Sequence, residues 1–255
     1  MLYIIGLGLD KGDLTLKALD ALKKCKIVYL ETYTSYSPYT IKELEKFLEK
    51  DMIKADREMI EQKAEIILKE AKKQNIALLV SGSPLTATTH TDLILRARKL
   101  GIKVHVIHGI SVLNAISDTG LHVYKFGKTA SIPKSQENYK PESFYDIIME
   151  NLAINAHTLM LLDIGLEVHD ALLNVKEIAS KRGEDISNMN FVVCSRLGTY
   201  KQDIKTGKIN ELLKEKFELP ACIIALAPLH FMEAEMLGIK QEEKKHDGKK
   251  DDNKV

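Results

Sequence analysis

Cysteine, net charge and long hydrophobic runs are all scarce in this chain. Its three cysteines, Cys25, Cys194 and Cys222, are odd in number, widely spaced and without a CxxC pair. This pattern argues against a disulfide scaffold or a zinc finger and predicts reduced thiols in a cytoplasmic protein. The 37 basic and 36 acidic residues leave a net charge of +1, which gives no general attraction to nucleic acid or anionic membranes. No apolar run approaches the roughly 20 residues that span a bilayer.

Short aliphatic runs alternate with amphipathic segments through the N-terminal half. We expect strands at 2–5, 27–30, 76–80 and 104–107, and helices at 41–48, 56–71 and 88–100. Asp13 is the expected N-cap of a further helix that begins at Leu14. Apolar strands separated by helices predict a parallel sheet covered on both faces. Such sheets carry ligand-binding loops at the carboxyl ends of their strands, which here are residues 6–12, 82–90 and 108–111.

The pattern changes near residue 122, where polar and β-forming residues mix. Beyond it we expect helices at 142–151 and 168–179, strands at 158–162, 191–194 and 222–226, and a hairpin near 200–208. The chain therefore divides into two predicted α/β domains, residues 1–122 and 123–239. Residues 240–255 are almost entirely charged or polar, which predicts a disordered tail.

Gly6-Leu7-Gly8 follows the first predicted strand and resembles the beginning of a dinucleotide-binding fingerprint. Glu31 lies at the end of the second strand, where a ribose-binding acid would lie. The third glycine of the fingerprint should occupy position 11, which is Lys11. This mismatch argues against a nicotinamide or flavin site. The glycines then serve either a tight turn or the close approach of a ligand.

Residues 81–90 carry five hydroxyl side chains and a histidine between a strand and a helix. Hydroxyls and free amides at a helix N-terminus can hold the polar end of a small ligand. Alternatively, Thr86 or Thr88 caps the helix. The tyrosine-rich loop at 32–39 suits either a lid or contact with a protein, or else packing over the sheet edge.

Several longer motifs occur in one order along the chain. They are MLYIIGLGL at the start, ADRE at 55–58, ATTHTDLILRARKLGI at 87–102, GLHVYKFGKT at 120–129, PESFYD at 141–146 and HTLMLLDI at 157–164. Over residues 1–240 the chain resembles the diphthine synthase family, and ADRE, PESFYD and LILRARKLGI resemble its eukaryotic form. The resemblance implies the tetrapyrrole methylase fold: two α/β domains, with S-adenosylmethionine in the cleft between them, and a homodimer.

The resemblance also implies a reaction. Members of this family use S-adenosylmethionine to methylate elongation factor 2, on a histidine that carries a 3-amino-3-carboxypropyl group. The amino group becomes a trimethylammonium, giving diphthine, and eukaryotic members also form diphthine methyl ester. One alternative is a diverged cofactor-binding or protein-docking homologue that no longer catalyses. Another is a methyltransferase of a small tetrapyrrole, which the motifs at 87–102 and 120–129 disfavour.

The resemblance implies eight cofactor-binding positions, each matched to a position in the family, with Leu197 and Ala221 in a region where the sequence has diverged. They are Leu9, Ser83, Thr86, Ser111, Val112, Leu162, Leu197 and Ala221. Ser83 departs from the family, which usually has aspartate there. A serine offers the cofactor's ammonium only a neutral hydrogen bond, so we expect cofactor binding to be weaker by about tenfold.

The substrate side of the cleft is less defined by the sequence. The segment between Leu162 and Phe191 is shorter than is common in the family. No catalytic base can be assigned, and the chemistry requires no metal. Lys125, Lys128 and Arg196 are the candidate cations for the substrate's carboxylate.

Overall fold

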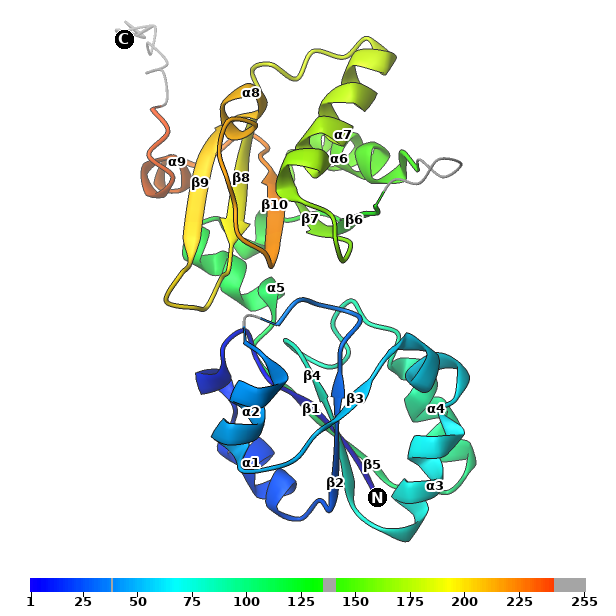
Figure 1. Ribbon diagram of the computed structural model, residues 1–255. Coiled ribbons are helices and arrows are strands. Elements are labelled where there is room, and N and C mark those ends of the chain that lie inside the picture. The colour runs from blue at the N-terminus through cyan, green and yellow to red at the C-terminus, as the bar shows by residue number, and fades with distance from the viewer. Residues whose placement is uncertain (38, 135–140, 241–255) are drawn as a thin grey trace, which may run out of the picture.

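The computed structural model describes residues 1–37, 39–134 and 141–240, which form two sheets with their own helices (Figure 1). The first sheet has five strands in the order β3-β2-β4-β1-β5. These strands are β1 (Leu2–Gly6), β2 (Ile27–Glu31), β3 (Ile53–Ala55), β4 (Ile76–Val80) and β5 (Val104–Ile107). Every strand pair in it is parallel, which confirms the predicted parallel sheet.

Helices cover both faces of this first sheet, as Figure 1 shows. They are α1 (Leu16–Lys23) and α2 (Ile41–Leu48) on one face, and α3 (Glu65–Lys73) and α4 (Thr91–Lys99) on the other. Alternate residues of β4 supply the two cores: Leu79 packs with α1 and α2, whereas Leu78 packs with α3 and α4. The strand is aliphatic throughout because both of its faces are buried.

The prediction that Asp13 caps the first helix is wrong. Thr15 caps α1 by accepting a hydrogen bond from the Ala18 amide. Asp13 ends a short 3-10 helix, Lys11–Asp13, and its carboxylate accepts from the amides of Leu9 and Asp10 at 2.8 and 3.0 Å. Its side chain therefore turns back to hold the loop that follows β1.

Two other helices differ from the sequence prediction. The expected helix after Asp56 is divided into a π-helical turn, η2 (Glu58–Gln62), and α3. The helix expected from Thr88 begins at Thr91, with His90 at its N-cap. Neither Thr86 nor Thr88 caps it, and the Thr88 hydroxyl donates to the Pro84 carbonyl at 2.6 Å instead.

The second sheet also has five strands, in the order β6-β7-β10-β8-β9. These are β6 (Ala130–Ile132), β7 (Thr158–Leu162), β8 (Asn190–Ser195), β9 (Asp203–Lys208) and β10 (Ala221–Ala225). Only the β6–β7 pair is parallel, so the sheet is mixed. The hairpin predicted near 200–208 is misplaced: these residues contain one strand, β9, which pairs antiparallel with β8 across a turn at 196–202.

Helices again cover both faces of the second sheet. One face carries α6 (Ser143–Ala153), α7 (Val168–Arg182) and α8 (Ile209–Leu212). The other packs against α5 (Val112–Ala115), the 3-10 helix η3 (Ile116–Thr119) and residues near α9 (Phe231–Met236). Ala115 and Leu121 belong to this core, so the chain passes from the first sheet to the second along residues 112–126.

Within the three described ranges, no helix is long and apolar enough to cross a membrane. The tail predicted at 240–255 lies, apart from Lys240, outside the described residues.

Candidate active site

Three glycines join the loops at the carboxyl ends of the central strands. Gly8 and Gly82 exchange two backbone hydrogen bonds, of 3.1 and 2.8 Å. A Cβ on Gly109 would lie 2.5 Å from the Gly82 oxygen and 2.6 Å from the Gly8 nitrogen, so no side chain fits. Gly8 also has a φ of +77°, a conformation that favours glycine. The glycines therefore serve the close approach of one loop to another, which fixes the site's geometry.

Glu31 shapes the loop that follows β2. Its carboxylate is buried and accepts hydrogen bonds from the Tyr33 amide, the Thr34 amide and the Thr34 hydroxyl, each at 2.6 Å. These contacts engage both carboxylate oxygens, so Glu31 holds Tyr33 and Thr34 in place rather than reaching a ribose.

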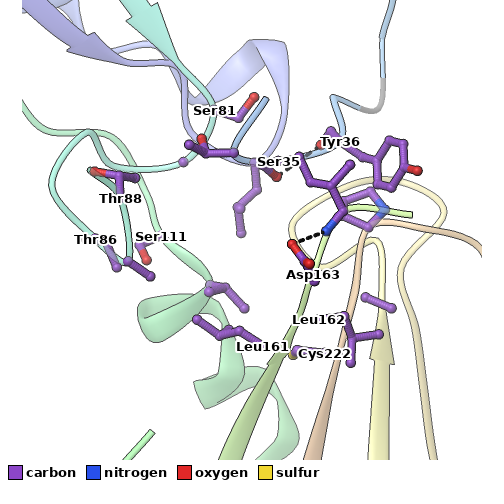
Figure 2. A pocket seen from close by; sticks show the side chains of 18 of the residues that line it. Ser35, Tyr36, Ser81, Thr86, Thr88, Ser111, Leu161, Leu162, Asp163 and Cys222 are labelled. Atoms are coloured by element: carbon purple, nitrogen blue, oxygen red, sulfur yellow. Dashed lines mark hydrogen bonds between the residues drawn. The ribbon is translucent and has the colours of Figure 1, made fainter. Parts of the chain in front are cut away.

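A cavity of about 400 Å³ lies between the two sheets. Figure 2 shows Ser81, Thr86, Thr88 and Ser111 on one side, and Leu161, Leu162 and Cys222 on the other. The volume is within the range of small-molecule sites. All eight positions that the resemblance assigned to the cofactor line it: Leu9, Ser83, Thr86, Ser111, Val112, Leu162, Leu197 and Ala221.

The two walls differ in chemistry. The first sheet contributes hydroxyls, and the second contributes mainly aliphatic side chains. Ser83 is 8% exposed, and its Oγ shares a hydrogen bond of 3.1 Å with Nδ1 of His108. Ser111 caps α5, accepting from the Leu113 amide at 3.2 Å. Such a cavity can hold a ligand that has one polar edge and one apolar face.

Two cysteines that are far apart in sequence meet in the aliphatic wall. Cys194 and Cys222 lie directly opposite each other on β8 and β10, and both line the cavity as free thiols. A hydrogen bond from Cys194, together with burial, raises the pKa of Cys222. Cys222 is therefore a neutral thiol at neutral pH and a poor nucleophile. Cys25, the third cysteine, is also free and buried.

The three cations predicted for the substrate's carboxylate lie elsewhere. Lys125 donates to Glu233 at 2.7 Å and to the Pro228 carbonyl at 2.6 Å. Lys128 pairs with Glu150 at 2.7 Å, and Arg196 pairs with Glu218. None of them lines the cavity. The charged side chains that the sequence reasoning missed are Arg57 and Asp163, which do line it.

Comparison with known proteins first defines the class. Residues 1–213 match the family model of the Tetrapyrrole (Corrin/Porphyrin) Methylases. A crystal structure of a diphthine synthase superposes with a TM-score of 0.86 at 32% identity, covering 93% of this chain and 95% of that one. The two-domain α/β fold is thereby confirmed.

Two curated relatives refine the class. Diphthine methyl ester synthase of Yarrowia lipolytica is 44% identical over 237 residues, which are 83% of this chain and 79% of the relative. Diphthine synthase of Methanococcus vannielii is 41% identical over 248 residues, covering 93% and 97%. The chain belongs to the diphthine synthases, within the tetrapyrrole methylase family.

Proposed function

We propose that the cavity between the two sheets binds S-adenosylmethionine, and that this chain is a methyltransferase of diphthamide biosynthesis. The observation that carries the proposal is the convergence of eight positions, between Leu9 and Ala221, on one cavity. These positions come from both halves of the chain. The size and the two-sided chemistry of the cavity suit an adenosyl amino acid.

The proposed acceptor is the 3-amino-3-carboxypropyl group on a histidine of elongation factor 2. S-adenosylmethionine, when bound, supplies a methyl group already activated by its sulfonium. The protein then has to align the acceptor nitrogen within roughly 3 Å of that methyl and exclude water. Ser83, Thr86 and Ser111 offer hydrogen bonds, whereas Leu162 and Leu197 supply apolar contact. The amine attacks in its neutral form, so it must first lose a proton.

Calorimetric titration with S-adenosylhomocysteine tests the cofactor site. We expect binding in the micromolar range, followed by methyl transfer to elongation factor 2 that carries the unmethylated group. Mass spectrometry of the product then counts the methyl groups and detects the ester. Absence of binding up to millimolar ligand would contradict the proposal and favour a docking homologue. Methylation of a porphyrin or corrinoid instead of the protein would contradict the substrate.

We also propose a cytoplasmic homodimer with a domain boundary near residue 122. The order of the strands supports two domains, because β1–β5 precede residue 122 and β6–β10 follow it, although α5 and η3, which also precede residue 122, pack against the second sheet. A dimer would have twice the 28.7 kDa mass of one chain in light scattering. A monomeric mass at micromolar concentration would contradict it.

A further inference from the structure

Few charged side chains line the cavity. Among its described lining residues, Arg57 is the one cation and Asp163 the one carboxylate. Arg57 precedes η2, on the first sheet's side, whereas Asp163 directly follows β7 of the second sheet. The cavity is therefore polarised, with a positive group from one half of the chain and a negative group from the other.

Arg57 is held by its neighbours at the edge of the cavity. Its guanidinium carbon lies 5.4 Å from the centre of the Tyr33 ring, and its Nε lies 3.9 Å from Oε1 of Glu61. Thr89 links these two partners, donating to Glu61 at 3.0 Å and sharing a 3.1 Å hydrogen bond with the Tyr33 hydroxyl. Three separate segments thus position one guanidinium.

The Arg57 side chain is more exposed to solvent than two of the proposed cofactor-binding serines. Its side chain is 66% exposed, whereas Ser83 and Ser111 are 8% and 5% exposed. Arg57 is therefore open to solvent at the edge of the cavity, whereas the two serines lie in its enclosed part. The guanidinium keeps its donor fork open toward solvent, because its ring and carboxylate neighbours contact the carbon and Nε.

We propose that Arg57 binds the carboxylate of the substrate's 3-amino-3-carboxypropyl group and thereby selects the modified histidine. This inference rests on the proposed function. A planar guanidinium matches a carboxylate with two parallel hydrogen bonds, which a lysine cannot reproduce. Asp163 strengthens the orientation, because its negative charge repels that carboxylate from the opposite side of the cavity.

A double-mutant-type cycle of binding measurements isolates the contact between Arg57 and the substrate's carboxylate. Elongation factor 2 is prepared with and without the 3-amino-3-carboxypropyl group, and each form is titrated into wild type and Arg57→Gln. The wild type should prefer the modified form. Arg57→Gln should reduce that preference by about tenfold or more, because a charge-assisted hydrogen bond is lost. Arg57→Lys should restore part of it by keeping the charge. In the methyl-transfer assay the loss should appear mainly in KM for the protein.

The matched control is Arg98→Gln on α4, which removes the same charge from an exposed site outside the cavity. It should keep the full preference. S-adenosylhomocysteine should bind both glutamine variants within about twofold of wild type, since Arg57 is not one of the eight proposed cofactor positions and Arg98 lies outside the cavity. Circular dichroism melting checks that each variant folds.

Other outcomes would overturn the inference. An unchanged preference in Arg57→Gln would show that Arg57 does not read the carboxylate. An equal loss of S-adenosylhomocysteine affinity would assign Arg57 to the cofactor instead. Failure of the wild type to bind S-adenosylhomocysteine or to methylate elongation factor 2 would refute the proposed function itself, and is distinguishable because it precedes any substitution.

Discussion

Ser83 occupies the position in the cavity wall where the family resemblance implies an aspartate. Its hydroxyl is nearly buried and shares a hydrogen bond with His108, so it presents a neutral oxygen to the cavity. A carboxylate there would pair with the ammonium that S-adenosylmethionine and S-adenosylhomocysteine both carry. Replacing the carboxylate with a serine should therefore weaken the binding of either ligand.

Ser83→Asp should tighten S-adenosylhomocysteine binding by about tenfold, because a charge-assisted hydrogen bond replaces a neutral one. Calorimetry at fixed ionic strength measures the change. Ser187→Asp adds the same charge at an exposed position outside the cavity and should leave the affinity unchanged. Weaker or equal binding by Ser83→Asp would mean that the ammonium does not lie beside residue 83.

Site residues could be predicted from the sequence when their assignment did not depend on contacts with residues far away along the chain. The eight proposed cofactor positions were assigned one at a time from the family resemblance, and all of them line one cavity. Arg57 and the Cys194–Cys222 pair were missed because only the folded chain brings their partners together. Lys125 was misassigned for the same reason: its partner, Glu233, lies 108 positions further on.

Among the helices and strands, the buried elements were the ones whose bounds could be predicted from the sequence. β4 is buried along its whole length and matches its predicted bounds. β3 was missed because Ile53 and Lys54 are exposed at the sheet edge, which leaves no apolar pattern. The helix expected after Asp56 kept its apolar period through residues 60–71, but the backbone breaks near Lys63 between η2 and α3.

The close approach of Gly8, Gly82 and Gly109, here called the glycine junction, supports the loops that line the cavity. Gly109→Ala would place a Cβ against two backbone atoms that cannot move independently. We expect a loss of about 1–3 kcal/mol in the free energy of unfolding and a marked loss of S-adenosylhomocysteine affinity. Gly12→Ala is the matched control, since its Cβ would have only an ordinary contact of 3.6 Å with Asp10. Denaturant unfolding and calorimetry measure both effects, and equal behaviour of the two variants would contradict the junction's role.

A buried carboxylate ties α9 to the segment that joins the two sheets. Glu233 has no exposed surface and accepts hydrogen bonds from the amides of His122 and His230 and from Lys125. Burial alone raises its pKa, but these hydrogen bonds and one with His157 lower the pKa of Glu233 to about 2. The unfolded chain therefore binds a proton more readily than the folded one at acidic pH.

It follows that Glu233 stabilises the fold above its unfolded pKa, about 4.3, and that this contribution is lost as the pH falls toward 2. Glu233→Gln should remove that part of the pH dependence. It should also lower the free energy of unfolding at pH 7 by about 2–3 kcal/mol, because Lys125 loses its anion. Glu235→Gln, on the exposed side of α9, is the control. Urea unfolding across pH 2–7 tests this, and parallel pH profiles for wild type and Glu233→Gln would contradict it.

At the scale of the whole molecule, loops of both sheets line one cavity. A ligand that contacts both walls stabilises the two halves jointly. S-adenosylhomocysteine at 100 times its dissociation constant should add about 2.7 kcal/mol to the free energy of unfolding, which corresponds to a rise in Tm of about 5–10 °C.

Differential scanning calorimetry shows whether the ligand stabilises the two halves of the chain together or only one of them. We expect one transition that moves as a unit with the ligand, and a smaller shift in Gly109→Ala at the same ligand concentration, because its dissociation constant is higher. Two transitions, of which only one moved with the ligand, would mean that a single half binds it. Since Ser83 and Ser111 lie on one wall and Leu162 and Ala221 on the other, a cofactor that uses all four must couple the halves.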